Sequence, residues 1–87
     1  MERFTVKGVE RLIRAGGSRI YTEKALKGQG KLALRVRGEN AEWLFQYYVD
    51  GRRRMIKLGP ASGDAALSLA EASNRVTPLR RQVVDGL

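Results

Sequence analysis

Basic and hydrogen-bonding side chains recur at alternate positions in three short segments of this chain, residues 31–37, 42–49 and 52–58. Side chains of a β-strand alternate between its two faces, so residues two apart share a face. On this basis one face carries cations, an amide and a phenol, from Lys31, Arg35, Arg37, Gln46, Tyr48, Arg53 and Lys57. Arginine can fork onto guanine, glutamine onto adenine, and lysine can bind phosphate, so the pattern indicates nucleic-acid recognition.

The opposite face of the same segments is apolar. It collects Leu32, Leu34, Val36, Trp43, Phe45, Tyr47, Val49, Ile56 and Leu58. The three aromatic residues could form a base-stacking surface for single-stranded nucleic acid. They share their face with aliphatic residues, however, and burying one such side chain is worth roughly 1.5–3 kcal/mol. A hydrophobic core is therefore the favoured interpretation of this face.

The polar face is interpreted as a binding surface, although a solvated sheet face is the simpler alternative. No acidic partner is expected inside the strands, and like charges on neighbouring strands repel. A face with a purely structural role would be expected to alternate its charges. Lys31, Lys57 and the run of Arg52, Arg53 and Arg54 are expected to contact phosphates.

The composition favours a polyanionic partner and argues against an enzyme. The 87 residues fit one domain, with 17 Lys and Arg against 9 Asp and Glu and a net charge of +8. The chain has no His and no Cys, and its acidic residues are scattered. We therefore expect no catalytic residue, no metal site and no cofactor. Apolar runs of membrane-spanning length and a signal segment are absent, so a cytoplasmic location is expected.

Two helices are predicted around the three strands. Thr5 can cap a helix from Val6 to about Ala15, whereas the segment 19–22 has strand propensity but is short. Asp50-Gly51 predicts a type I′ turn, because both central positions of such a turn need positive φ.

The last helix is predicted to begin at a capping box formed by Ser68 and Glu71. Apolar residues are spaced to place one side of this helix on the sheet, at Leu69, Ala72, Val76, Leu79 and Val83. Pro78 predicts a kink, or a break with Thr77 capping a second piece. The predicted fold is α+β: a three-stranded antiparallel sheet packed on a C-terminal helix, with a short N-terminal helix.

The order of these motifs resembles the N-terminal arm-type DNA-binding domain of phage and genomic-island integrases of the tyrosine recombinase family. The resemblance is carried by Leu32-x-Leu34-x-Val36, Trp43-x-Phe45-x-Tyr47, Gly51-x-Arg53, Ile56-x-Leu58-Gly59 and Ser68-Leu-Ala-Glu-Ala72, and it extends over about residues 5–85. It implies a sheet that enters the major groove of arm-type sites flanking the recombination core. The residues implied to face DNA are Arg35, Arg37, Leu44, Gln46, Tyr48, Arg53, Met55 and Lys57.

The resemblance also implies that residues 1–87 are one domain of a longer integrase whose catalytic domain lies outside this chain. Its partner would be double-stranded DNA, with other integrase domains and accessory DNA-bending proteins as further partners, and with no membrane. Two alternatives stay open at this point. One is a protein-interaction module that uses Leu44, Tyr48 and Met55, and the other is an RNA-binding domain.

Overall fold

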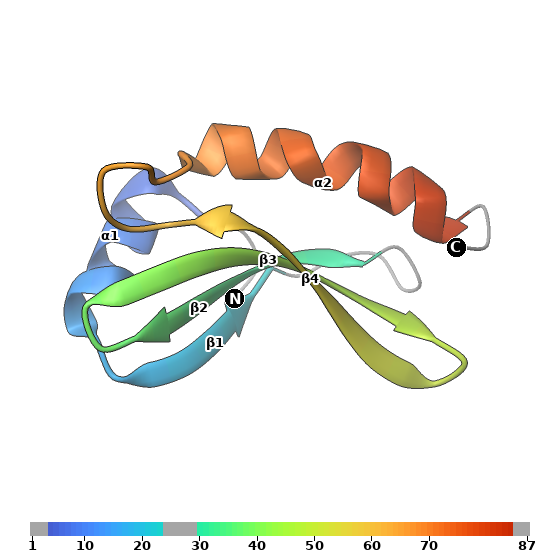
Figure 1. The fold of residues 1–87 in the computed structure, drawn as a ribbon, viewed down its shortest axis with the longest axis horizontal. Coiled ribbons are helices and arrows are strands. Elements are labelled where there is room, and N and C mark those ends of the chain that lie inside the picture. Colours follow the sequence, from blue (N-terminus) through green and yellow to red (C-terminus); the bar gives the residue numbers. More distant parts are fainter. Residues whose placement is uncertain (1–3, 24–29, 85–87) are drawn as a thin grey trace.

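The computed structural model describes residues 4–23 and 30–84, which form an α+β fold with two helices and one four-stranded sheet (Figure 1). In chain order the elements are α1 (Val6–Ala15), β1 (Ser18–Thr22), β2 (Lys31–Arg37), β3 (Asn40–Val49), β4 (Arg52–Pro60) and α2 (Leu69–Val84). Each strand pairs antiparallel with the next, and the spatial order follows the chain order. Helix α2 runs along one face of the sheet. Neither helix, in the described part of the chain, is long and apolar enough to cross a bilayer.

The sheet has one more strand than predicted. The additional strand, β1, pairs with β2, with Ser18 opposite Arg37 and Thr22 opposite Ala33. All five of its side chains are exposed or half-buried, so no apolar alternation marks the segment in the sequence. Backbone pairing holds β1 to β2. Just before the first residue of β1, the carbonyl of Gly17 accepts a further hydrogen bond from the N–H of Gly38 at 2.7 Å.

The predicted hairpin turn is confirmed. Asp50 and Gly51 both have positive φ, 51° and 76°, and Val49 lies opposite Arg52 on either side of the two-residue turn. This geometry is that of a type I′ turn, which matches the twist of the strands it joins. The turn therefore sets the register of β3 against β4, and with it the residues that share each face.

The core lies between the sheet and the two helices, and the prediction that α2 covers the apolar face is confirmed. Trp43 is 1% exposed, its ring meets that of Phe4 edge-on at 5.7 Å, and its indole N–H donates to the carbonyl of Leu67 at 2.9 Å. The buried core comprises Phe4, Val9, Leu32, Leu34, Val36, Ala41, Trp43, Phe45, Ala72 and Val76. The aromatic residues at the centre of β3 are thus core residues and not a base-stacking surface.

Both helix starts are capped as predicted. The Thr5 hydroxyl accepts from the N–H of Gly8 at 3.0 Å. At the start of α2, the N–H of Ser68 donates to the Glu71 carboxylate, and the N–H of Glu71 donates to the Ser68 hydroxyl, both at 3.1 Å. This reciprocal pair satisfies backbone donors that a helix start otherwise leaves without partners.

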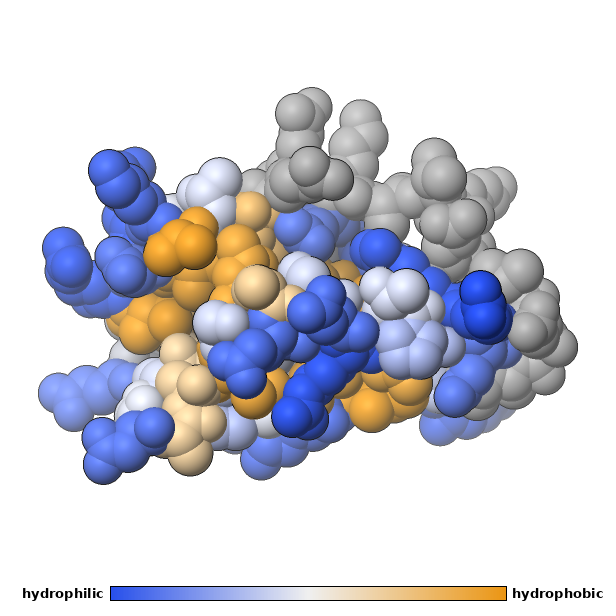
Figure 2. Space-filling model, turned by 90° about the horizontal axis from the view of Figure 1, so that it is seen from above, coloured by the Kyte–Doolittle hydropathy of each residue, from blue (hydrophilic) through white to orange (hydrophobic). Residues whose placement is uncertain are grey.

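Helix α2 continues through Pro78 without a break, so of the two predicted alternatives the break with a cap at Thr77 is wrong. Proline removes one backbone N–H, which leaves the carbonyl of Asn74 without its usual donor. Both residues are exposed, so water can satisfy that carbonyl. The sheet side of the helix remains continuously apolar across this point. Figure 2, which looks down on α2, shows hydrophilic residues along the helix and hydrophobic ones gathered toward the end where α1 lies.

A β-bulge interrupts the pairing of β3 with β4. Leu44 lies opposite Lys57 but Trp43 lies opposite Gly59, so Leu58 is an extra residue in β4. Such a bulge adds one residue to one strand of a pair. On either side of it, the side chains of β4 still alternate between the two faces of the sheet.

Candidate nucleic-acid interface

We call the sheet face opposite α2 the outer face. Because Trp43 and its neighbours on alternate positions pack toward α2, the residues between them point the other way. The cross-strand register brings five cations from β2 and β4 onto the outer face, Lys31, Arg35, Arg37, Arg53 and Lys57. β1 adds the uncharged Ser18, Ile20 and Thr22. The predicted separation of the Trp43 indole from these five cations is confirmed.

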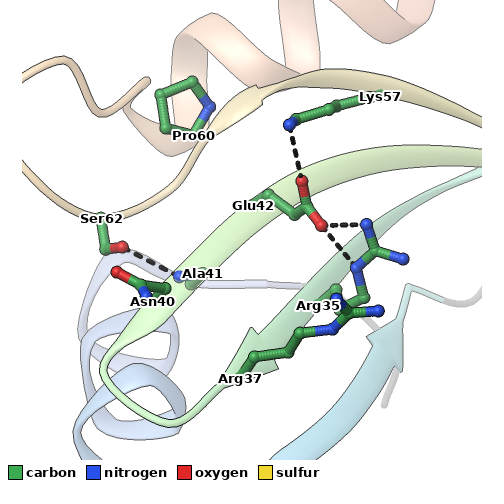
Figure 3. Close-up of a pocket in the computed structure, with 8 residues that line it drawn as sticks. All are labelled: Arg35, Arg37, Asn40, Ala41, Glu42, Lys57, Pro60 and Ser62. Atoms are coloured by element: carbon green, nitrogen blue, oxygen red, sulfur yellow. Dashed lines mark hydrogen bonds and ion pairs between the residues drawn. The ribbon is translucent and has the colours of Figure 1, made fainter.

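The outer face contains an acidic residue, so the expectation of no acidic partner is wrong. Glu42 of β3 lies directly opposite Arg35 of β2. One carboxylate oxygen, Oε1, accepts from the Nε and Nη2 of Arg35, and the other, Oε2, lies 3.2 Å from the Nζ of Lys57 (Figure 3). The parity that puts Gln46 and Tyr48 on the outer face also puts Glu42 there, so the sequence held this signal. The pairing with Arg35 depends on the length of the 38–39 turn.

Gln46 lies on the outer face but is buried, with 5% of its surface exposed. It sits on the central strand between Lys31 of β2 and Met55 of β4, which are themselves only partly exposed. A side chain so placed presents little of its amide to a base edge. Among the predicted contact residues, Arg37, Tyr48, Arg53 and Lys57 are the exposed ones on the outer face.

The run of three arginines divides between the two faces. Arg53 lies opposite Tyr48, on the outer face, whereas Arg52 and Arg54 lie opposite Val49 and Tyr47, on the side of α2. All three are exposed. They do not form one phosphate-binding cluster on the outer face, because consecutive strand residues point in opposite directions.

The predicted apolar contact surface loses one of its three members. Leu44 is 2% exposed and Met55 is partly buried, whereas Tyr48 is 59% exposed. Leu44 is buried on the outer face without belonging to the core cluster against α2. Tyr48 alone offers a large accessible ring there.

A shallow pocket of about 540 Å³ opens beside the Glu42 ion pairs. Figure 3 shows the charged side chains of Arg35, Glu42 and Lys57 meeting across three strands. The pocket is lined by Arg35, Arg37, Asn40, Ala41, Glu42, Lys57, Pro60 and Ser62. Its rim is polar and basic, which suits an anionic or hydrogen-bonding ligand surface.

Comparison with protein families decides the wider assignment. The model of the family described as "Arm DNA-binding domain" matches residues 4–87, nearly the whole chain. The chain belongs to this family. Neither a search of curated proteins nor one of solved structures gives a match. Members are the arm-type DNA-binding domains of integrases, so the arm domain described here is a DNA-binding domain with a role in DNA integration.

The pKa of two carboxyl groups in the arm domain is lowered below the ordinary value of 4.5. For Glu42, burial raises the pKa, but the hydrogen bonds and positive charges of Arg35 and Lys57 together outweigh burial. For Glu71, hydrogen bonds from Ser68 lower the pKa. Both groups are therefore ionised at neutral pH.

Acid is expected to destabilise the arm domain through these groups. A carboxyl whose pKa is lower in the folded state stabilises the fold above its unfolded value, and that stability is lost as the pH falls through the folded value. The loss should thus set in as the pH drops below 4.5. Urea midpoints from about pH 7 down to about pH 3 measure it. Glu42→Gln should show a shallower acid loss than the unaltered domain, and an identical acid profile would contradict this account.

Proposed function

We propose that the outer face enters the major groove of duplex DNA at arm-type sites, and that this contact positions an integrase for site-specific recombination. The observation that carries the proposal is the division of the sheet: one face is occupied by α2, and the other gathers five cations against one carboxylate. The family assignment supports duplex DNA as the partner.

The dimensions of the sheet fit this role. Adjacent strands lie about 4.8 Å apart, so β2, β3 and β4 together are about 10 Å across. The major groove is about 12 Å wide and admits such an element. All five cations of the outer face lie on β2 and β4, and β1, whose outer-face residues are uncharged, would lie at the groove edge.

Within this proposal the outer-face cations have different tasks. Arg35 is half-buried and held by Glu42, which suits contact with a base edge. Arg37 and Arg53 are exposed toward opposite ends of the outer face, where they can bind phosphates. The chain carries no residue with a proposed role in strand cleavage, and it acts by binding.

Binding should depend steeply on salt. If four or five phosphates are neutralised, the plot of log affinity against log salt should have a slope of about −4. Arg37→Ala and Arg53→Ala should each make the slope shallower by about 0.9, because each removes one phosphate contact. Fluorescence anisotropy with labelled duplex at several salt concentrations measures these slopes.

Arg81→Ala is the matched control, since Arg81 is an exposed arginine on α2, away from the outer face. It should leave the slope unchanged. A slope near zero for the unaltered domain would overturn the proposal. Duplex RNA competing as well as duplex DNA would favour an RNA-binding role instead, because the narrow major groove of RNA does not admit a sheet.

A further inference from the structure

Glu42 is an acidic side chain at the centre of a surface otherwise suited to an anionic partner. It lies on β3, between the two strands that carry the outer-face cations, and its two oxygens are shared between Arg35 of β2 and Lys57 of β4. Its side chain is 18% exposed and that of Arg35 is 27% exposed, whereas that of Lys57 is 68% exposed. The carboxylate thus reduces the positive charge where two strands' cations meet.

The geometry leaves Arg35 able to recognise a base. A guanidinium group has five N–H donors, and the ones used here come from Nε and Nη2. Nη1 and the second hydrogen of Nη2 remain, and this pair is the fork that matches O6 and N7 of guanine. The carboxylate also restricts the long arginine side chain before DNA is bound. Less conformational entropy is therefore lost when the guanidinium contacts a base.

The same carboxylate disfavours phosphate at this place. Cations contribute to non-specific binding by neutralising phosphates, which releases counterions from the DNA. A cation already paired with a carboxylate neutralises less phosphate charge, so fewer counterions are released when it contacts DNA. A carboxylate also repels phosphate directly. It can accept from a base edge, since the amine of cytosine is a donor in the major groove.

We propose that Glu42 is a specificity-determining residue, which positions Arg35 for the guanine of a G·C pair and withholds Arg35 and Lys57 from phosphates of unrelated DNA. This inference rests on the proposed function of the outer face. It predicts two opposite effects of removing the carboxylate: binding to unrelated DNA should become stronger, and discrimination between DNA sequences should become weaker.

The decisive experiment compares the unaltered domain with Glu42→Gln on two duplexes. A preferred duplex is first selected from a randomised pool with the unaltered domain, and an unselected duplex serves as the reference. Glu42→Gln should bind the reference duplex several-fold tighter, with a salt slope steeper by about 1 to 2. Its preference for the selected duplex should fall about tenfold, the scale of one lost bidentate contact. Glu10→Gln, which removes the same charge from the exposed surface of α1, should change neither quantity.

A second comparison uses exposed residues only, so it does not depend on Glu42→Gln folding. Lys57→Gln should make the slope shallower by much less than the roughly 0.9 expected for Arg53→Gln, because Lys57 is already paired. A further check, which does require the Glu42→Gln variant to fold, repeats both substitutions in that background, where the two effects should become equal.

The outcomes separate the two proposals. A flat salt slope for the unaltered domain overturns the proposed function and this inference with it. A steep slope with equal effects of Lys57→Gln and Arg53→Gln in the unaltered domain overturns the inference alone. So does a Glu42→Gln variant that folds and keeps the original preference.

Discussion

Trp43→Ala is expected to destabilise the arm domain by about 3–5 kcal/mol, the range found when a large buried aromatic side chain is removed. Trp43 is 1% exposed and contacts the ring of Phe4, so the substitution opens a cavity between α1, the sheet and α2. It also leaves the carbonyl of Leu67 without the indole donor. Because small domains have total stabilities near the low end of about 5–15 kcal/mol, most of the fold's stability would be lost.

Denaturant unfolding followed by circular dichroism measures this change, and Trp43→Phe is the matched control. Phenylalanine keeps an aromatic ring in the core and removes the hydrogen bond to Leu67, so it should cost about 1–3 kcal/mol. If Trp43→Ala costs no more than Trp43→Phe, cavity formation is not the main effect. The position of Trp43 beneath α2 would then need revision.

Gly30→Ala is expected to cost about 2–5 kcal/mol, a large effect for one added methyl group. Gly30 has φ of 78°, a conformation that side-chain-bearing residues adopt at a cost of about 1–2 kcal/mol. A Cβ there would lie 2.8 Å from Cε1 of Phe45 and 3.0 Å from the carbonyl oxygen of Gln46. Phe45 is fully buried and cannot move aside, so overpacking adds about 1–3 kcal/mol.

Gly63→Ala separates the two contributions. Gly63 has a similar φ of 86°, but an added Cβ there meets no atom within 4 Å. It should therefore cost only the backbone contribution. Phe45→Leu combined with Gly30→Ala should cost less than the sum of the two single substitutions, as measured by denaturant unfolding in a double-mutant cycle. Equal costs for Gly30→Ala and Gly63→Ala would refute the contact with Phe45.

Local signals in the sequence were sufficient for most of the fold. Asp50-Gly51 predicted its turn because few residue pairs accept positive φ twice in succession, and Ser68 with Glu71 predicted a helix start because their side chains satisfy each other's backbone donors. The segment 19–22 has strand propensity but is not part of the predicted three-stranded sheet, because no side chain of β1 is fully buried and its place depends on pairing with β2. Pro78 was overinterpreted, since an exposed proline in a helix with a well-packed opposite side need not end it.

The candidate site was less accessible from the sequence than the fold. Alternation gave the face of each side chain correctly, including Arg53 as distinct from its two neighbours. It could not give exposure, which is why Gln46 was expected to reach DNA although it is buried. It also could not give the partners of Arg35 and Lys57, because ion pairs across strands depend on register. Register is set by the turns and by the bulge, whose extra residue leaves no mark in the sequence pattern.

The bulge at Leu58 divides the hairpin into two parts that can be exchanged separately. Residues 44–57 pair one to one around the turn, whereas the chain from Gly59 onward is joined to the start of β3 through Ala61 and Ser62, which form hydrogen bonds with Ala41. Replacing 44–57 as a block, with its length kept even, would exchange one set of outer-face side chains without altering the bonds between Ala41 and the chain that leads to α2. Adding or removing one residue within this block would shift the register and invert its faces, so Leu58 is the natural junction for exchanging the end of the hairpin.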